Sequence, residues 1–196
     1  VPIRHFRHIP WTVYRGSQKN ESGILVQAFD HGWTVEKNLV WKLAALPDDP
    51  EINQQWPVMT TYPDADIRLK QAWNIRASAP DVVLAVIDTG VRIDHEDLAG
   101  NIWNNEQELG GTPGVDDDGN GYVDDINGWN TNQDSSDVVD TNGHGTRVAG
   151  IAAAVGDNTT GIAGVCWNVQ VMTIRAFTTS TTTTDALLGG IDYVLA

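Results

Sequence analysis

Two segments of the chain carry side chains that can transfer a proton. Asp88 follows the apolar run 82–87 and precedes Thr89 and Gly90. His144 lies 56 positions further on, between two glycines, where a helix is expected to begin. A carboxylate at the end of a buried strand can hold a histidine in one tautomer and stabilise its cation. Taken separately, Asp88 could be a turn former at the end of a strand, and His144 could be a packed structural histidine. Together, in these contexts, they indicate general acid–base chemistry.

The segment 116–125 is the densest group of oxygen ligands in the chain, with five aspartates in ten residues. Its first six residues match the start of an EF-hand calcium loop, with glycine at the sixth position for the sharp turn. Position 12 is an asparagine and no flanking helices are expected, so we interpret a related loop closed by one of the last two aspartates. Hard oxygen ligands favour calcium over zinc; a solvated acidic loop is the alternative. The expected ligands are Asp116, Asp118, Asn120, the Tyr122 carbonyl, and Asp124 or Asp125.

The motifs around the proposed acid–base pair resemble those of a known family. Ile87-Asp88-Thr89-Gly90 and His144-Gly145-Thr146, followed by Val-Ala-Gly, are similar to the aspartate and histidine motifs of subtilisin-like serine proteases, the subtilases, and occur in that family's order. Segments 93–98 and 161–165 also resemble the family. Glu96 replaces a usual proline, and Arg147 a second histidine that is not catalytic. The resemblance covers about 47–196.

This resemblance implies an endopeptidase that acts on polypeptide substrates. His144 would be the general base and then the general acid, and Asp88 would orient it. The family's serine in a Gly-Thr-Ser context and its oxyanion asparagine are not found among the 196 residues. We therefore expect an N-terminal portion of the catalytic domain, truncated before the serine and inactive alone. The alternative is a non-catalytic calcium-binding or adhesion module. A metal hydrolase is disfavoured, because the other histidines of this chain are not at a plausible spacing for metal ligands.

The resemblance also implies a second calcium site. The segment 155–162 is similar to the strong calcium loop of thermitase-like subtilases, and two aspartates upstream match the family's remaining ligands. Composition alone would favour turn formation for these polar residues. The ligands carried over are the carbonyls of Val155, Thr160 and Ile162 and the side chains of Asn158, Asp97 and Asp49. Such a site would stabilise only the folded state.

The elements that must position these residues follow an alternating pattern. The run 82–87 predicts a strand buried on both faces, as in a parallel sheet. Residues 100–143 have no long apolar run and read as one long loop. The remaining expected elements are a short helix at 66–73, a small-residue helix at 146–155, a strand at 169–176 and a helix from 185 onward. This alternation predicts an α/β fold with a parallel sheet. The resemblance implies a three-layer subtilisin-like fold, with a mainly parallel, incomplete sheet flanked by helices.

Two domains are expected, with the boundary at the proline-containing turn 46–50. Residues 33–40 resemble the end of a subtilase inhibitory propeptide. Residues 1–45 are therefore interpreted as the C-terminal part of a propeptide, although residues 1–32 match too weakly to be assigned. Such a propeptide would inhibit the full-length protein and assist its folding. Residues 46–196 are the protease-like part.

The amino-acid composition excludes several functions and structural features. Twelve basic against 26 acidic residues give a net charge of −14, which argues against general nucleic-acid binding. There is no run of 18 apolar residues, and one cysteine cannot form an internal disulfide. We expect a secreted protein, extracellular or periplasmic, that requires calcium.

Overall fold

The computed structural model describes residues 2–5, 12–14, 46–59 and 67–196. The chain divides into two units, Val1–Leu43 and Ala44–Ala196. In the first unit, strands β1 (Pro2–His5) and β2 (Thr12–Tyr14) pair in antiparallel fashion. The rest of the segment expected to be a propeptide lies outside the described residues.

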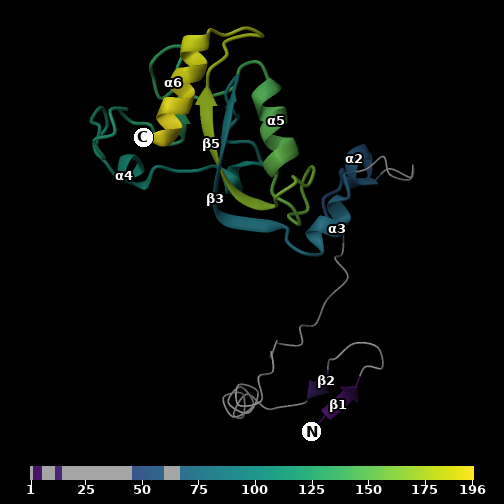
Figure 1. Cartoon of the computed structure of the whole chain (residues 1–196). Helices are drawn as coiled ribbons and strands as arrows, with labels where there is room; N and C mark the ends of the chain where they lie inside the picture. Colours follow the sequence, from purple (N-terminus) through teal and green to yellow (C-terminus); the bar gives the residue numbers. More distant parts are fainter. Residues whose placement is uncertain (1, 6–11, 15–45, 60–66) are drawn as a thin grey trace. The chain divides into compact units, whose positions relative to one another are not determined.

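The second unit contains a three-stranded sheet in the order β3-β5-β4 (Figure 1). Strand β3 (Ser78–Asp88) pairs with β5 (Asn168–Arg175), which in turn pairs with β4 (Gly128–Trp129). Both pairings are parallel, which confirms the predicted α/β class with a partial sheet. The register sets Asp88 beside Arg175, so the two long strands end at the same edge, where parallel sheets form their sites.

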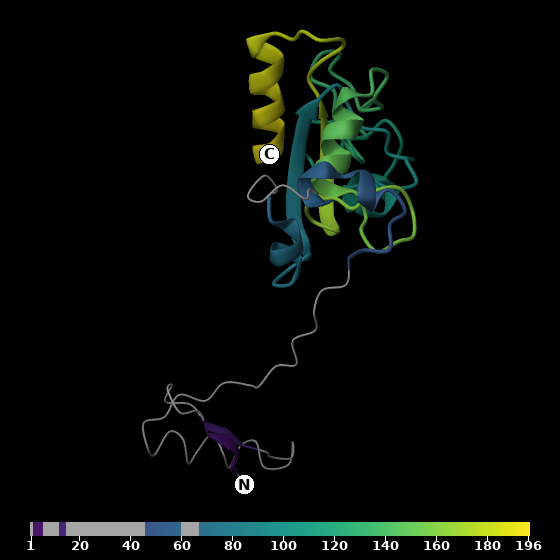
Figure 2. The same cartoon turned by 90° about the vertical axis from the view of Figure 1, so that its right-hand side faces the viewer.

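Two helices cover opposite sides of the sheet, α5 (His144–Ala153) on one and α6 (Thr184–Leu195) on the other (Figure 2). Ala149 and Ala153 are fully buried and pack with Val86 and Val171 of the strands. Their small side chains let α5 approach the sheet closely. On the other side, Tyr193 of α6 packs with buried residues of β4 and β5.

Short helices complete the unit. η2 (Ile52–Gln54), α2 (Trp56–Met59) and α3 (Leu69–Trp73) precede the sheet, and η3 (Ala99–Asn101) and α4 (Glu106–Leu109) follow β3. The expectation of a long loop region over 100–143 needs correction only in that the segment includes the short elements α4 and β4. Asn105 caps α4 by accepting from the N–H of Gln107. Within the described ranges, every helix is too short or too polar to span a lipid bilayer.

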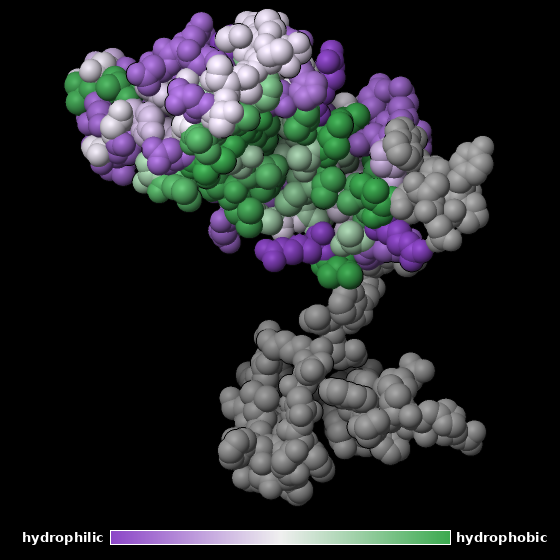
Figure 3. All heavy atoms as spheres, turned by 45° about the horizontal axis from the view of Figure 1, so that its top comes forward, coloured by the Kyte–Doolittle hydropathy of each residue, from purple (hydrophilic) through white to green (hydrophobic). Residues whose placement is uncertain are grey.

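The first half of β3 is open to solvent, which corrects the prediction of a strand buried on both faces. Val82 and Val83 are 51% and 43% exposed. The reason is the sheet topology, because β3 lies at the edge of the described sheet. Its side chains become less exposed only in the second half of the strand, where Val86 is buried. Leu188 and Ile191 of α6 are also exposed. Figure 3 shows a broad apolar region on one face of this unit.

Candidate functional site

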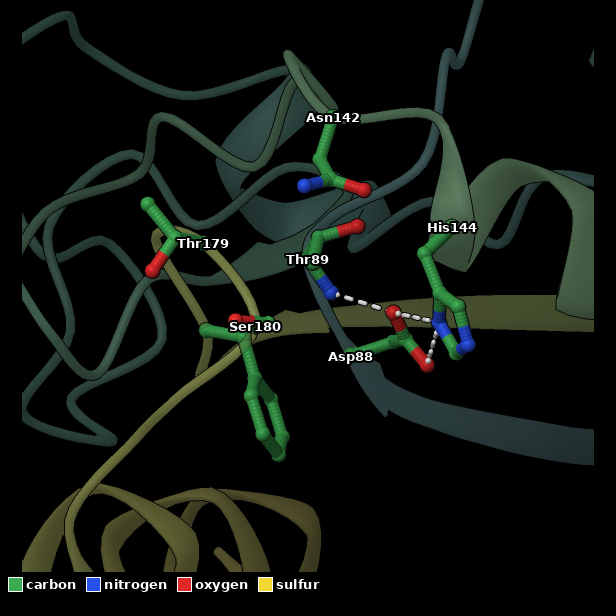
Figure 4. A pocket seen from close by; sticks show the side chains of 7 residues that line it. Asp88, Thr89, Asn142, His144, Thr179 and Ser180 are labelled. Carbon is green, nitrogen blue, oxygen red and sulfur yellow. Dashed lines mark hydrogen bonds and ion pairs between the residues drawn. The ribbon is translucent and has the colours of Figure 1, made fainter.

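Asp88 and His144 meet where a strand ends and a helix begins. Asp88 is the last residue of β3, and His144 is the first residue of α5. The imidazole Nδ1 lies 2.8 and 2.9 Å from the two carboxylate oxygens of Asp88 (Figure 4). Opposite a carboxylate, Nδ1 must carry the proton, so a neutral ring leaves Nε2 free to accept one. This is the arrangement of a general base held by its orienting acid.

The two members of the pair differ in solvent access. The side chain of Asp88 is 14% exposed and accepts a hydrogen bond of 2.7 Å from the N–H of Thr89. The side chain of His144 is 66% exposed. The carboxylate is thus fixed within the protein while the ring faces solvent. Such a ring can exchange protons with a molecule that binds in front of it.

Close approach of α5 to β3 depends on Gly145. A Cβ atom at this position would lie 2.2 Å from the carbonyl oxygen of Gly90 and 3.0 Å from Cβ of Asp88. The first distance is one that real Cβ atoms essentially never show, and the second is tighter than nine in ten real Cβ contacts. Glycine after the histidine is therefore required for the hydrogen bond between His144 and Asp88.

A hollow of about 200 Å³ opens beside the pair. Its lining includes two hydroxyl side chains, Thr179 and Ser180, from the segment between β5 and α6 (Figure 4). In the described part of the chain, no hydroxyl forms a hydrogen bond with the His144 ring. The hollow is lined by Asp88, Thr89, Asn142, His144, Phe177, Thr179 and Ser180.

Asp140 is a buried carboxylate beside this pair that sequence reasoning missed. It is 6% exposed and accepts five hydrogen bonds from side-chain and backbone donors. Burial raises its pKa, but hydrogen bonds from Thr146, Gly143 and Asn142 outweigh that effect and lower the pKa to about 2. The available sequence signal was its position four residues before His144, at a predicted helix start.

The acidic loop brings three carboxylates together, and one of them was missed. Oxygens of Glu108, Asp118 and Asp125 lie within 4.8 Å of one another. Glu108 and Asp125 are 4% and 0% exposed. Glu108 comes from α4, eight residues before the loop, where no short-range pattern connects it with the loop. Its Oε1 accepts from the N–H of Asp117 and its Oε2 from that of Asp124, which holds the loop around it.

Amide side chains complete this cluster. Asn105 donates to Asp118 at 2.8 Å and to Asp125 at 2.9 Å, and Asn120 donates to both at 3.1 Å. The hydrogen bond from Asn105 lowers the pKa of Asp118, although burial opposes this shift. The backbone N–H of Tyr122 donates to Asn120 and tightens the turn. Buried carboxylates in their charged form repel one another, and a cation would relieve that repulsion. The donor set therefore fits calcium.

Two of the expected ligands, Asp116 and Asp124, are not part of this group of three carboxylates. Asp116 accepts from the backbone N–H groups of Gly119, Asn120 and Gly121, so it shapes the loop. Both oxygens of Asp124 accept from the N–H of Gly114. Of the two aspartates expected to close the loop, Asp125 lies with Glu108 and Asp118.

Residues expected at the second calcium site form hydrogen bonds with Asp97 and with one another. The side chain of Asn158 donates to one oxygen of Asp97 at 3.3 Å, and the N–H of Ile162 donates to the other at 2.9 Å. The N–H of Val155 donates to the Asp97 carbonyl, and the N–H of Thr160 to the Asn158 side chain. Four of the five other residues expected at this site thus lie in one hydrogen-bonded group with Asp97, three of them through their backbone N–H groups.

Asp49 has an environment that suits a cation ligand. It is 1% exposed, and one of its oxygens has no hydrogen-bond partner in the described structure. Its other oxygen accepts from the N–H of Asp157, in the 155–162 loop, at 2.7 Å. Burial raises the pKa of Asp49, and the charge of Asp97 adds to the increase. A buried, unpartnered carboxylate oxygen next to a second carboxylate fits a cation ligand.

Comparison with known proteins agrees with this geometry. The model of the subtilase family matches residues 79–195. The chain belongs to the subtilase family. It is 47% identical over 93 residues to subtilisin-like protease 1 of Plasmodium vivax, covering 47% of this chain and 15% of that protein. It is 32% identical over 148 residues to thermitase of Thermoactinomyces vulgaris, covering 75% of this chain and 43% of that protein.

Further relatives cover similar parts of this subtilase chain. Extracellular protease of Xanthomonas campestris is 33% identical over 153 residues, covering 72% of this chain and 25% of that protein. A protease structure from Pseudoalteromonas arctica has a TM-score of 0.54 at 26% identity and covers 75% of this chain and 43% of that one. The chain thus spans less than half the length of each of these relatives.

Proposed function

We propose that this chain supplies the aspartate and histidine of a serine-type endopeptidase. The observation that carries the proposal is the hydrogen bond of 2.8 Å between Nδ1 of His144 and the Asp88 carboxylate, in a chain of the subtilase family. The pair lies at the edge where the parallel strands end, beside a hollow open to solvent. The relatives' names describe proteases, which favours the same chemistry here.

In this mechanism Nε2 of His144 takes the proton of a serine hydroxyl as its oxygen attacks the peptide carbonyl carbon. The imidazolium that forms is stabilised by Asp88, which stays ionised. The same nitrogen then gives the proton to the leaving amine. We further propose that the serine and the oxyanion donors lie outside residues 1–196, so that this chain alone does not hydrolyse peptides. Ser180, which lines the same hollow, is the alternative nucleophile within the chain.

We propose calcium at both acidic sites. Asp49, Asp97 and Asn158, with the carbonyls of Val155, Thr160 and Ile162, would hold one ion, and Glu108, Asp118 and Asp125 another. A bound ion would supply charge neutralisation and a crosslink between distant segments, which stabilises only the folded state. The orphaned oxygen of Asp49 and the convergence of three buried or half-buried carboxylates support this assignment.

The remaining proposals concern location and partners. A relative from Xanthomonas campestris is named an extracellular protease, and the net charge of −14 suits an extracellular, calcium-rich environment. We propose secretion for the whole protein, polypeptides as its substrates, and residues 1–45 as part of its propeptide.

Covalent labelling tests the catalytic proposal. The natural protein that contains these 196 residues is treated with a fluorophosphonate, and the modified residue is located by mass spectrometry. We expect an adduct on a serine outside residues 1–196, strongly slowed labelling in His144→Ala, and no adduct on the isolated chain. An adduct on Ser180 would place the nucleophile inside the chain. Absence of any adduct on the natural protein would leave a non-catalytic module.

A further inference from the structure

The carboxylate of Asp140 connects the two segments that carry the acid–base pair. From the helix side it accepts from the N–H groups of Asn142 and Gly143, both at 2.8 Å. It also accepts from the N–H and the hydroxyl of Thr146, at 3.0 and 2.6 Å. From the strand side it accepts from the hydroxyl of Thr89 at 3.0 Å. One buried side chain therefore contacts both the residue after Asp88 and the first turn of α5.

The hydroxyl of Thr89 continues this connection. It donates to Asp140 and accepts from the N–H of Gly145 at 2.9 Å. The backbone N–H of the same residue donates to the Asp88 carboxylate at 2.7 Å. A chain of hydrogen bonds thus leads from Asp88 through Thr89 and Asp140 to the turn that begins with His144. Neither Thr89 nor Asp140 is exposed beyond 6%.

We propose that Asp140, acting through Thr89, is a positioning residue that fixes the His144 ring against Asp88. The inference rests on the proposed function, because the pair it positions is the proposed catalytic pair. It adds to that function a residue that touches neither substrate nor the transferred proton. Its effect is on the geometry of the Nδ1 hydrogen bond and hence on the tautomer of His144.

A carboxylate suits this place better than an amide. Its two oxygens take part in five hydrogen bonds and act as the acceptor in all of them. An ionised carboxylate is an acceptor at every lone pair, whereas asparagine would turn an NH₂ group toward some of these donors. Asp140→Asn should therefore loosen the first turn of α5 without removing a charged group from the pair itself.

A residue that only caps α5 would also show these contacts, so the test must report on the pair. The tautomer of neutral His144 provides this, since Asp88 holds the proton on Nδ1 and a ring released to water is free to carry it on Nε2. Long-range ¹H–¹⁵N spectra of the ¹⁵N-labelled 196-residue chain distinguish the two forms. The variants are Asp140→Asn, Thr89→Val, which removes the bridging hydroxyl, and Thr89→Ser, which keeps it.

Asp137→Asn is the matched control. Asp137 lies in the same loop, but its carboxylate is 58% exposed and pairs with Arg175 at 3.0 Å. This variant removes one negative charge at a similar place in the sequence and leaves the hydrogen bonds of Asp140 in place. Backbone amide spectra of each variant show whether the fold is kept.

The expected results separate this inference from the proposed function. In the wild type, Asp137→Asn and Thr89→Ser, His144 should be mainly in the Nδ1–H form. In Asp140→Asn and Thr89→Val the ratio of Nδ1–H to Nε2–H should fall about three- to tenfold, the effect of one weakened hydrogen bond. An unchanged ratio in both variants would overturn the inference. A wild type without the Nδ1–H form would contradict the pair, and with it the proposed function. If Asp140→Asn does not fold, the two Thr89 variants decide.

Discussion

Acid should remove a defined part of the stability of this chain through Asp140. The pKa of Asp140 is lowered from 3.8 to about 2, so the ionised form is stabilised in the folded state. One unit corresponds to about 1.4 kcal/mol, and the shift therefore contributes about 2 kcal/mol to the free energy of unfolding. Because the folded pKa is depressed, this contribution is present above about pH 4 and is lost as the pH falls toward 2.

Urea unfolding followed by circular dichroism, at pH values from 2 to 6 and with a chelator present, measures this effect. Asp140→Asn cannot titrate at this position. The difference in unfolding free energy between wild type and variant should therefore shrink by about 2 kcal/mol between pH 5 and pH 2. Any constant difference reports lost hydrogen bonds and does not enter the test. A difference that stays the same over this pH range, or grows as the pH falls, would show that Asp140 is not ionised more easily in the folded state than in the unfolded state.

Three further substitutions test the sites. Calcium at one hundred times the dissociation constant should stabilise the wild type by about 2.7 kcal/mol, and Asp49→Asn should lose most of the resulting increase in melting temperature. An unchanged increase would exclude Asp49 as a ligand. Glu108→Gln should weaken calcium binding at the acidic loop at least tenfold in calorimetry, because it removes one of three carboxylates, whereas equal affinity would exclude Glu108. Gly145→Ala should cost about 1–3 kcal/mol in urea unfolding, because its Cβ would lie 2.2 Å from the carbonyl of Gly90. An unaffected Gly145→Ala protein would show that the close approach is not required.

Local patterns predicted the parts of the fold that local interactions decide. The apolar run ending at Asp88 and the glycines around His144 indicated a strand end and a helix start, and the structure has both. The exposure of Val82 and Val83 was not predictable in the same way. It depends on which strands lie beside β3, and a continuous apolar run does not report its neighbours.

The candidate sites show the same division. The spacing of oxygen ligands in 116–125 indicated the acidic loop, but could not show that Glu108 would enter it from α4. Nor could it show that Asp116 and Asp124 bond to backbone N–H groups instead. Asp140 was overlooked because an aspartate before a helix is usually a cap. Its contact with Thr89 joins residues 51 positions apart and emerges only when β3 and α5 pack together.

If Asp88 and His144 form the acid–base pair of a serine endopeptidase, peptide hydrolysis by the natural protein that contains this chain must depend on both side chains. In subtilisin, loss of the histidine lowers kcat about 10⁶-fold and loss of the aspartate about 10⁴-fold. We predict that His144→Ala and Asp88→Asn lower kcat by factors of that order, with KM little changed and the fold intact. Activity within tenfold of wild type in either folded variant would contradict the account.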